Sequence, residues 1–353
     1  MKKDSASGAQ NPTSRKRLSH SLYGSTMNNT FPQQQQVSSR PFHLLTTVIR
    51  WFDSWAGIDE RASEHPPRVD WLRVLPFIAM HAMCFAVIWV GWSWSAVAVA
   101  GALYVIRMFA ITGFYHRYFS HRAFKTSRWC QFVFALLGAS AVQRGPLWWA
   151  AHHRHHHANS DRVEDTHSPL HHGFLWSHMG WFTSRAAFAT NLRVVPDLAK
   201  FSELCFLDRF DIVIALLLAV SLYSLGLGLE IFAPELATSG MQILVWGFFI
   251  STVILYHCTY TINSLAHQIG RKRYDTKDQS GNSLLLAFIT FGEGWHNNHH
   301  HYPASVRQGF YWWEIDLTYY LLVLLSWTGV IWDLKPVPQH VRNSRRAGLP
   351  TAA

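Results

Sequence analysis

The chain has 353 residues, of which 49% are hydrophobic and only 15% are charged, whereas about 25% of the residues in a typical soluble domain are charged. This shortage of charge favours a membrane protein over an ordinary soluble domain. The formal net charge of +10 suits an anionic membrane surface or anionic substrates, and since no zinc-finger or RNA-binding signature accompanies the basic residues, no nucleic-acid partner is expected.

Both ends of the chain are polar. Residues 1–45 are rich in Ser, Asn and Gln, so we predict a disordered N-terminal tail there. The tail begins with lysines, but no apolar segment follows them, which argues against a secretory signal. Residues 336–353 are predicted to form a basic C-terminal tail.

Four apolar stretches between these tails are long enough to cross a bilayer, which takes about 20 residues of helix. They lie at about 74–92, 96–115, 212–229 and 241–261. A short joint separates the first stretch from the second and the third from the fourth. We therefore predict four transmembrane helices, arranged as two antiparallel hairpins.

Basic residues after the second and fourth stretches predict the orientation of the chain. They place both termini in the cytoplasm, together with a cap formed by residues 116–210 and 263–335. A shorter apolar run at 319–332 is predicted to lie at the membrane interface. The expected fold is thus an all-α, multi-pass integral membrane domain over 70–335, with a cytosolic helical cap. Arg107, inside the second stretch, is a candidate for a functional role, but a side chain that snorkels or pairs within the bundle is the favoured interpretation.

The 22 histidines are the anomaly of the composition, and many of them fall in three clusters. The first cluster is HRYFSH at 116–121, the second is HRHHH at 153–157, and the third is HNNHHH at 296–301. All three lie at the predicted cytoplasmic ends of helices. For three such boxes on one face of the membrane, chance is a poor explanation.

Spacing indicates how these histidines could act together. Residues three and four apart share a helical face, so each HxxHH box can direct two or three imidazoles to one point. The five-residue separation of His116 and His121 suits ligands shared between two neighbouring metal positions. Eight histidines exceed the four ligands of a closed zinc site, so a dinuclear oxidation centre is the economical interpretation. They are His116, His121, His153, His156, His157, His296, His299 and His300.

A fourth element follows the last predicted span. Asn263 and His267 are four residues apart and share a helical face directed at the same cytoplasmic surface. His267 could therefore complete the shell as a ninth imidazole, with Asn263 as a direct or water-mediated ligand. Imidazole suits Fe, Zn, Cu and Ni, so the ligand type does not select the metal.

These motifs resemble the membrane acyl desaturase family, most closely acyl-CoA desaturases of the stearoyl-CoA Δ9 type. The likeness covers about residues 70–335 and also includes FLWSHMGW at 174–181 and WEIDLTYY at 313–320. It implies two iron ions held by the nine histidines, with Asn263 through a water. In that family O₂ is the co-substrate, and a cis double bond is formed between two adjacent methylenes of a long acyl chain.

The resemblance also implies a separate electron donor, of the ferredoxin, rubredoxin or cytochrome b5 type. No fused haem domain and no cysteine cluster for an iron–sulfur centre stand in the sequence. Together with the polar tail, this is typical of an enzyme of the bacterial inner membrane.

Selectivity for one methylene pair requires a narrow apolar tunnel beside the metals. Trp148, Trp149 and Trp181 lie close to the boxes and are candidates for its walls. Tyr104 stands where the family places a residue near the closed end of the tunnel. Arg144 and Arg154 are the candidates for the headgroup of the substrate.

Two departures from the family pattern affect the carrier of the acyl chain. Animal acyl-CoA desaturases have an Arg-Asp pair that helps to bind CoA immediately before the second box, where this chain has Ala151 and His152. An upstream Asn of that family is Arg144 in this chain. The carrier could therefore be CoA, acyl-carrier protein or a phospholipid. A hydroxylase on the same scaffold is the nearest alternative activity, because both reactions begin with the same hydrogen abstraction. A metal transporter with His-rich loops is a distant one.

Overall fold

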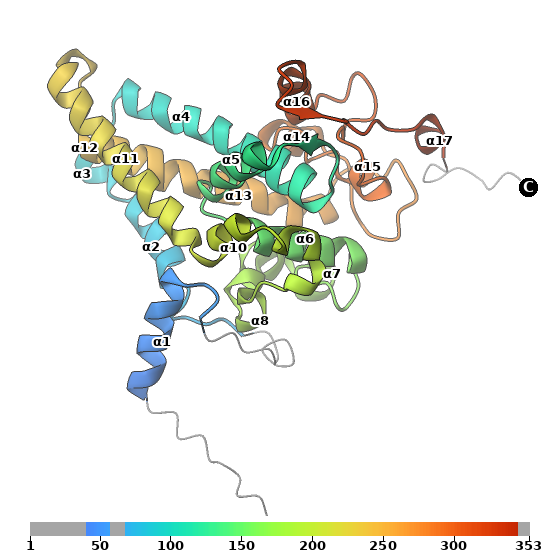
Figure 1. The fold of residues 1–353 in the computed structure, drawn as a ribbon, viewed down its shortest axis with the longest axis horizontal. Helices are drawn as coiled ribbons and strands as arrows, with labels where there is room; N and C mark the ends of the chain where they lie inside the picture. Colours follow the sequence, from blue (N-terminus) through green and yellow to red (C-terminus); the bar gives the residue numbers. More distant parts are fainter. Residues whose placement is uncertain (1–39, 57–67, 345–353) are drawn as a thin grey trace, which may run out of the picture. The chain divides into compact units, whose positions relative to one another are not determined.

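Helices are the main secondary structure of the chain that the structure, a computed structural model, describes, namely residues 40–56 and 68–344 (Figure 1). Most of the predicted N-terminal tail lies outside these residues. Its last part does not, because helix α1 runs from Arg40 to Phe52. Two short strands depart from the all-α prediction: β1 (Lys125–Thr126) and β2 (Ile331–Trp332) pair antiparallel, with Thr126 opposite Ile331.

Three helical segments are long and apolar enough to cross a membrane: Trp94–Ser120, Asp211–Phe232 and Gly240–His267. They coincide with the second, third and fourth predicted spans. The first consists of α4 (Trp94–Phe109) and the π-helix η2 (Ala110–Ser120), and the second is α11 (Asp211–Phe232). The third combines α12 (Gly240–Ile243), the π-helix η7 (Leu244–Ile250), α13 (Ser251–Asn263) and the 3₁₀ turn η8 (Leu265–His267).

The first predicted span is a shorter, interrupted helix. It comprises α2 (Leu75–Cys84) and α3 (Val87–Val90), and the run ends at Gly91, whose φ is +67°. Its length falls below the roughly 20 residues that a spanning helix needs, so helix length supports three spans rather than four. The predicted interfacial run forms α16 (Leu317–Trp327) and then turns into β2.

Arg107 lies on α4 and is fully buried where α4 packs against η7 and α13. Its guanidinium donates to Ser251 Oγ at 2.7 Å and to Thr252 Oγ1 at 2.6 Å. Ser251 in turn donates to the carbonyl of Ala100 on α4 at 2.8 Å. The expectation that Arg107 pairs within the bundle is confirmed, and no separate function is needed to explain it.

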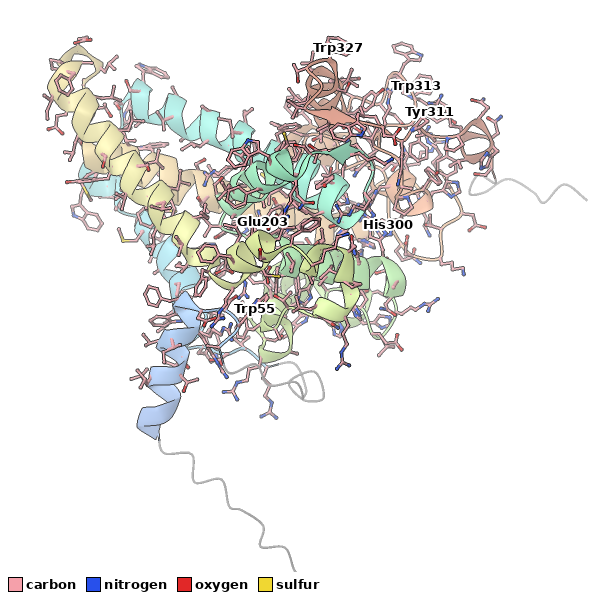
Figure 2. All side chains as sticks on the ribbon, in the orientation of Figure 1. Trp55, Glu203, His300, Tyr311, Trp313 and Trp327 are labelled. Carbon is pink, nitrogen blue, oxygen red and sulfur yellow. The ribbon has the colours of Figure 1, made fainter. Side chains whose placement is uncertain are left out.

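Short helices pack around one large core. Phe114 of η2 stacks on Phe134 of α5, with ring centroids 3.8 Å apart, and η2 also packs against α6. Trp55, labelled in Figure 2, donates its indole N–H to Asp208 at 2.9 Å and so ties the end of α1 to α10. The remaining helices are α5 (Arg128–Ala139), α6 (Pro146–Asn159), α7 (Pro169–His172), η3 (Trp176–Gly180), η4 (Trp181–Thr183), α8 (Arg185–Phe188), η5 (Leu192–Val194), α9 (Pro196–Ala199), α10 (Ser202–Arg209), η6 (Pro234–Leu236), α14 (Leu284–Ile289), α15 (His296–His301) and α17 (Gln339–Arg342).

Candidate metal centre

The first histidine box lies at the end of the π-helix η2. The backbone N–H of His121 donates to the carbonyl of His116 at 3.3 Å, which closes one turn of the i to i+5 type. The Nε2 atoms of these two residues lie 3.1 Å apart. The expectation that they would be shared between two metal positions therefore differs from the structure, because the wider π turn brings both imidazoles to one point.

The second box lies on α6, and a residue of α10 fixes the start of this helix. Asp208 accepts a hydrogen bond from the N–H of Trp148 at 2.7 Å, at a helix end that has no capping side chain of its own. A Cβ on Gly145, just before α6, would lie 2.3 Å from the Cα of Asp208. Glycine is thus required for α10 to approach closely enough to make this contact.

The third box forms the six-residue helix α15, and the two asparagines inside the box hold it in place. Asn297 accepts from the backbone N–H groups of Arg273 at 2.8 Å and Tyr274 at 2.7 Å. Asn298 donates to Glu314 at 2.9 Å. Both asparagines are fully buried. A helix this short has little stability of its own, so these side-chain bonds determine where its histidines lie.

Nine histidines from these elements gather into two groups. Within each group the potential ligand atoms all lie within 4.8 Å of one another. The first, the five-histidine group, contains His116, His121, His153, His157 and His299. The second, the four-histidine group, contains His156, His267, His296 and His300. These are the nine histidines that the spacing of the sequence selected.

Each HxxHH box contributes to both groups. His153 and His157, four residues apart, join the five-histidine group, while His156 between them joins the other. The third box is divided in the same way, with His296 and His300 together and His299 apart. Two imidazoles of each box therefore converge, as predicted, and the third serves the neighbouring group.

The spacing of the Nε2 atoms suits metal coordination. In the five-histidine group, these atoms are 2.8 Å apart between His121 and His153, and 2.9 Å apart between His157 and His299. For metal–nitrogen bonds of about 2.1 Å, two ligands at right angles lie about 3.0 Å apart. The nitrogens thus already have the separations of a ligand shell. Neutral imidazoles fit iron, zinc, copper or nickel, so the site can hold two ions of this kind.

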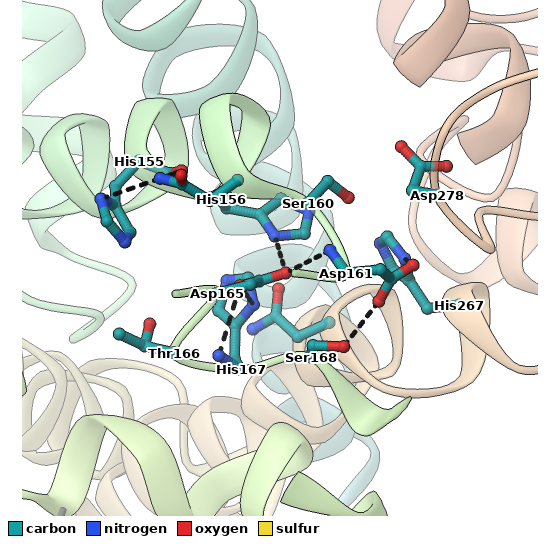
Figure 3. Close-up of polar contacts among 12 residues, drawn as sticks. His155, His156, Ser160, Asp161, Asp165, Thr166, His167, Ser168, His267 and Asp278 are labelled. Carbon is teal, nitrogen blue, oxygen red and sulfur yellow. Dashed lines mark hydrogen bonds and ion pairs between the residues drawn. The ribbon is translucent and has the colours of Figure 1, made fainter. Parts of the chain in front are cut away.

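Carboxylates sit behind the histidines, on the side away from each group. The Nδ1 atoms of His156 and His267 lie 3.0 Å from Asp165 and 2.9 Å from Asp161, respectively (Figure 3). Because an ionised carboxylate can only accept, it keeps the imidazole proton on Nδ1 and leaves the Nε2 lone pair facing inward. Asp278 does the same for His300 at 2.7 Å, and Glu293 contacts Nδ1 of His116.

Sequence reasoning did not select Asp161, Asp165, Asp278 or Glu293. The sequence does contain a signal for these carboxylates, because charged residues are scarce in this chain. Glu293 lies three residues before the third box, and Asp161 and Asp165 closely follow the second. Burial alone would raise the pKa of Asp161, but hydrogen bonds from His267, Gln279 and Ser168 lower it to about 2. This carboxylate therefore stays ionised at neutral pH.

Burial also determines the protonation of His156 in the four-histidine group. It lowers the pKa of His156 to about 3, with repulsion from His167 as the next cause. A histidine of this kind is neutral in the folded protein and takes up its proton on unfolding. Its contribution to stability is complete above the unfolded pKa of 6.5 and is lost as the pH falls from there toward about 3.

The metal-free protein is accordingly expected to unfold at progressively lower temperature as the pH falls below 6.5. His156 alone would contribute a slope of about 1.4 kcal/mol per pH unit in this range. Thermal unfolding of the metal-free protein between pH 8 and pH 4 measures this directly. A His156→Ala variant should show a shallower slope, and an unfolding temperature that stays constant over this range would contradict the expectation.

A cavity of about 510 Å³ reaches the five-histidine group. Three of the predicted tunnel residues, Trp148, Trp149 and Trp181, line it, and so does Arg144. A second, smaller cavity of about 40 Å³ lies against both groups. The two cavities share four lining residues, which are Trp149, His153, Thr259 and Asn263. Asn263 thus lies beside both groups, where a water-mediated contact to a metal was predicted.

Two predicted residues lie elsewhere. Tyr104 lines neither cavity, and its hydroxyl donates to the carbonyl of Ile289 at 2.5 Å. Arg154 also lines neither, because its guanidinium is bound to Asp197 at 2.6 Å and to the carbonyl of Phe119 at 2.8 Å. The local structure gives Arg154 a role in joining α6 to its neighbours rather than an open position for a headgroup.

Comparison with known proteins gives consistent matches. A model of the fatty acid desaturase family matches residues 92–324. The chain is 37% identical to the sn-1 stearoyl-lipid 9-desaturase of Anabaena variabilis, over 78% of this chain and 97% of that protein. It is 34% identical to an acyl-CoA 5-desaturase of Anemone leveillei, over 83% of this chain and 90% of that protein. A chloroplastic palmitoyl-monogalactosyldiacylglycerol delta-7 desaturase of Arabidopsis thaliana is 35% identical, over 85% of this chain and 75% of that protein.

Proposed function

The chain belongs to the fatty acid desaturase family and is an acyl desaturase, and we propose that it forms a cis double bond at the Δ9 position of a long saturated acyl chain. The observation that carries the proposal is the convergence of nine histidines on two adjacent points. We assign one iron ion to the five-histidine group and one to the four-histidine group, with Asn263 beside them.

Removing hydrogen from an unactivated methylene requires a strong oxidant that no side chain can provide, and two iron ions with O₂ would supply it. The residues of the chain have the other tasks. The carboxylates behind His116, His156, His267 and His300 orient these imidazoles, because each accepts from Nδ1 and leaves Nε2 facing inward. Over one cycle the substrate gives up two hydrogens, and together with two electrons and two protons from outside they convert O₂ into two waters.

The two cavities define the proposed path of the acyl chain. The large cavity brings the chain past Trp148 and Trp181 to Trp149, whose ring is stacked on His153 with centroids 5.1 Å apart. The small cavity, with Met108 and Ile111 in its wall, would receive the methyl end beyond the reacting carbons. A chain held on both sides of the histidine groups presents the same methylene pair in every cycle.

The setting of the reaction follows from the apolar helices. We propose that α2 and α3 complete a fourth membrane element beside the three long helices, with the cap and both termini in the cytoplasm of a bacterial cell. The electrons would come one at a time from a separate carrier of the ferredoxin, rubredoxin or cytochrome b5 type. The protein would thus work at the cytoplasmic surface of the inner membrane.

Expression in a bacterial host of defined lipid composition tests the activity. Total fatty acids are analysed by mass spectrometry with localisation of double bonds, and cells carrying an empty vector are the control. We expect new monounsaturated chains with the double bond at Δ9. Hydroxy fatty acids in place of unsaturated ones would assign the chain a hydroxylase reaction and overturn the proposal.

A further inference from the structure

One end of the large cavity is strongly basic. Arg50 of α1, Arg73 just before α2, and Arg144 between α5 and α6 all line it. Among the lining residues that the structure describes, the only acid is Asp211, and it is bound to Arg144 at 3.0 Å. Three guanidinium groups thus lie at one end of the cavity, and such a cluster suits an anionic ligand that several of them can bind at once.

The chain holds these arginines in place. Arg50 donates to the carbonyl of Ala56 at 3.0 Å, and Arg144 donates to the carbonyl of Phe188 at 3.1 Å. The guanidinium of Arg73 lies 4.1 Å from the centre of the Phe188 ring. Burial lowers the pKa of Arg73 to about 9; repulsion from Arg144 and Arg50 adds to the effect, and attraction to Asp211 and Asp70 opposes it. An anion bound among the three groups would relieve this repulsion.

The same end of the cavity lies on a surface suited to lipid. Arg50 and Trp51 of α1 line the cavity, while other residues of the helix expose a continuous apolar face. Its side chains are between 46% and 58% exposed: Leu44, Leu45, Ile49 and Phe52. An amphipathic helix with this pattern lies in the plane of a membrane with its apolar face in the acyl region. Its inner face then holds Arg50 at the level of the lipid headgroups.

The cavity wall also reaches the outside between two apolar helices. Pro76 and Ala79 of α2 and Leu216 of α11 line the cavity and are at the same time exposed. In the bilayer these positions face lipid tails, because α11 is long and apolar enough to span it. From this side the apolar lining continues to His153 and Asn263. An acyl chain can therefore pass from the membrane to the histidine groups without crossing water.

We propose that the acyl chain reaches the enzyme on a phosphate-bearing lipid of the bilayer, which enters between α2 and α11 and binds its phosphate to Arg50, Arg73 and Arg144. This inference rests on the proposed desaturase function and identifies the carrier of its substrate. CoA and acyl-carrier protein also carry phosphate, but they approach from the cytosol, where two arginines beside the histidine boxes line neither cavity. Arg122 and Arg154 both bind Asp197, at 2.8 Å and 2.6 Å.

A pulse–chase experiment in cells distinguishes these carriers. Saturated phospholipids are labelled before the enzyme is induced, fatty acid synthesis is then blocked, and intact lipids are analysed by mass spectrometry. We expect the labelled, preformed phospholipids to become unsaturated after the block. If unsaturation stops at the block, although it occurs before it, the lipid carrier is overturned and the desaturase function stands. Absence of unsaturation under both conditions would instead reject the function itself.

A matched pair of substitutions on α11 tests the entrance. Leu216 lines the cavity, whereas its neighbour Leu217 is equally lipid-facing and does not. Leu216→Trp is expected to slow desaturation of preformed phospholipid at least about tenfold by filling the entrance, while Leu217→Trp stays within about twofold of the original chain. Equal rates for the two variants would overturn entry between α2 and α11.

The arginines are tested by selectivity rather than by activity alone. Purified full-length protein, with reduced ferredoxin, is given vesicles containing distearoyl-phosphatidylglycerol or a distearoyl galactolipid without phosphate. We expect the phosphate lipid to be preferred by at least about tenfold, and Arg73→Gln to remove most of that preference. A general folding defect would lower both rates and leave their ratio unchanged. A ratio near one for the original chain, or an unchanged ratio in the Arg73→Gln protein, would overturn the assignment of the phosphate site.

Discussion

A chain in which His156 is replaced by alanine is expected to form no double bond and to bind about one iron ion instead of two. His156 is buried in the four-histidine group, and Asp165 orients its Nε2 atom into that group. Without this imidazole three ligands remain, and the pocket left behind admits water. The product is measured as double bonds in total fatty acids, and iron is measured by elemental analysis of the purified protein.

His155 supplies the matched control, because it is the preceding residue of the same helix. Its Nε2 lies 3.0 Å from the carbonyl oxygen of Glu164, and it belongs to neither histidine group. His155→Ala is expected to keep both iron ions and at least about half of the activity. If His156→Ala kept full iron content and activity, or if both variants lost them equally, the assignment of His156 as a ligand would be wrong.

The effect of His156→Ala is expected to reach the other group as well. His156 and His157 are adjacent on α6 yet serve different groups, as do His299 and His300 on α15. The rings of His157 and His300 are stacked with centroids 4.5 Å apart across the boundary between the groups. A shift of one ring is therefore transmitted through a shared helix and a direct contact, so loss of one ion should also alter the spectroscopic signature of the ion that remains.

The clustering of histidines in the sequence was sufficient to select the nine, and helical periodicity explains why the residues four apart in each HxxHH box face one point. Periodicity could not predict which group the middle histidine of each box joins, because that depends on how α6 and α15 lie relative to each other. This placement depends on Asp208, Asn297 and Asn298, whose partners are distant in the sequence. The π-helical turn at His116 could not be predicted either, because nothing in local propensity distinguishes it from an α-helix.

The remaining differences also have physical causes. The apolar count over 74–92 predicted a full span, yet Gly91 at positive φ and the break after Cys84 shorten the helix. Tyr104 was placed near the closed end of the tunnel by its position in the family pattern, which does not predict the bond from its hydroxyl to the carbonyl of Ile289. Composition over a stretch predicts that a segment is apolar, whereas tertiary contacts decide how far it stays helical and which way a single side chain points.

Arg117 joins the first histidine box to the segments around the third. It is 1% exposed, and its guanidinium binds Glu293 at 3.1 Å, Asp316 at 2.9 Å and the carbonyl of Val306 at 2.8 Å. Glu293 in turn contacts Nδ1 of His116. One buried cation thus compensates two buried carboxylates, one of which orients a candidate metal ligand.

Replacement of Arg117 by leucine is expected to destabilise the protein by about 3–5 kcal/mol, because it leaves two carboxylates buried without a cation. The loss would be measured as a lower temperature of thermal unfolding in detergent and as a smaller yield of monodisperse protein. Arg128→Gln is the control, since Arg128 makes equally short bonds to Glu203 (labelled in Figure 2) but is 66% exposed, so no measurable change is expected. The stability of the Arg117→Lys protein should lie between those of the two variants, because an ammonium group keeps the positive charge but lacks the planar geometry that binds two carboxylates at once. Equal stability of the Arg117→Leu and Arg128→Gln proteins would contradict this account and would mean that Glu293 and Asp316 find protons or water once the guanidinium is gone.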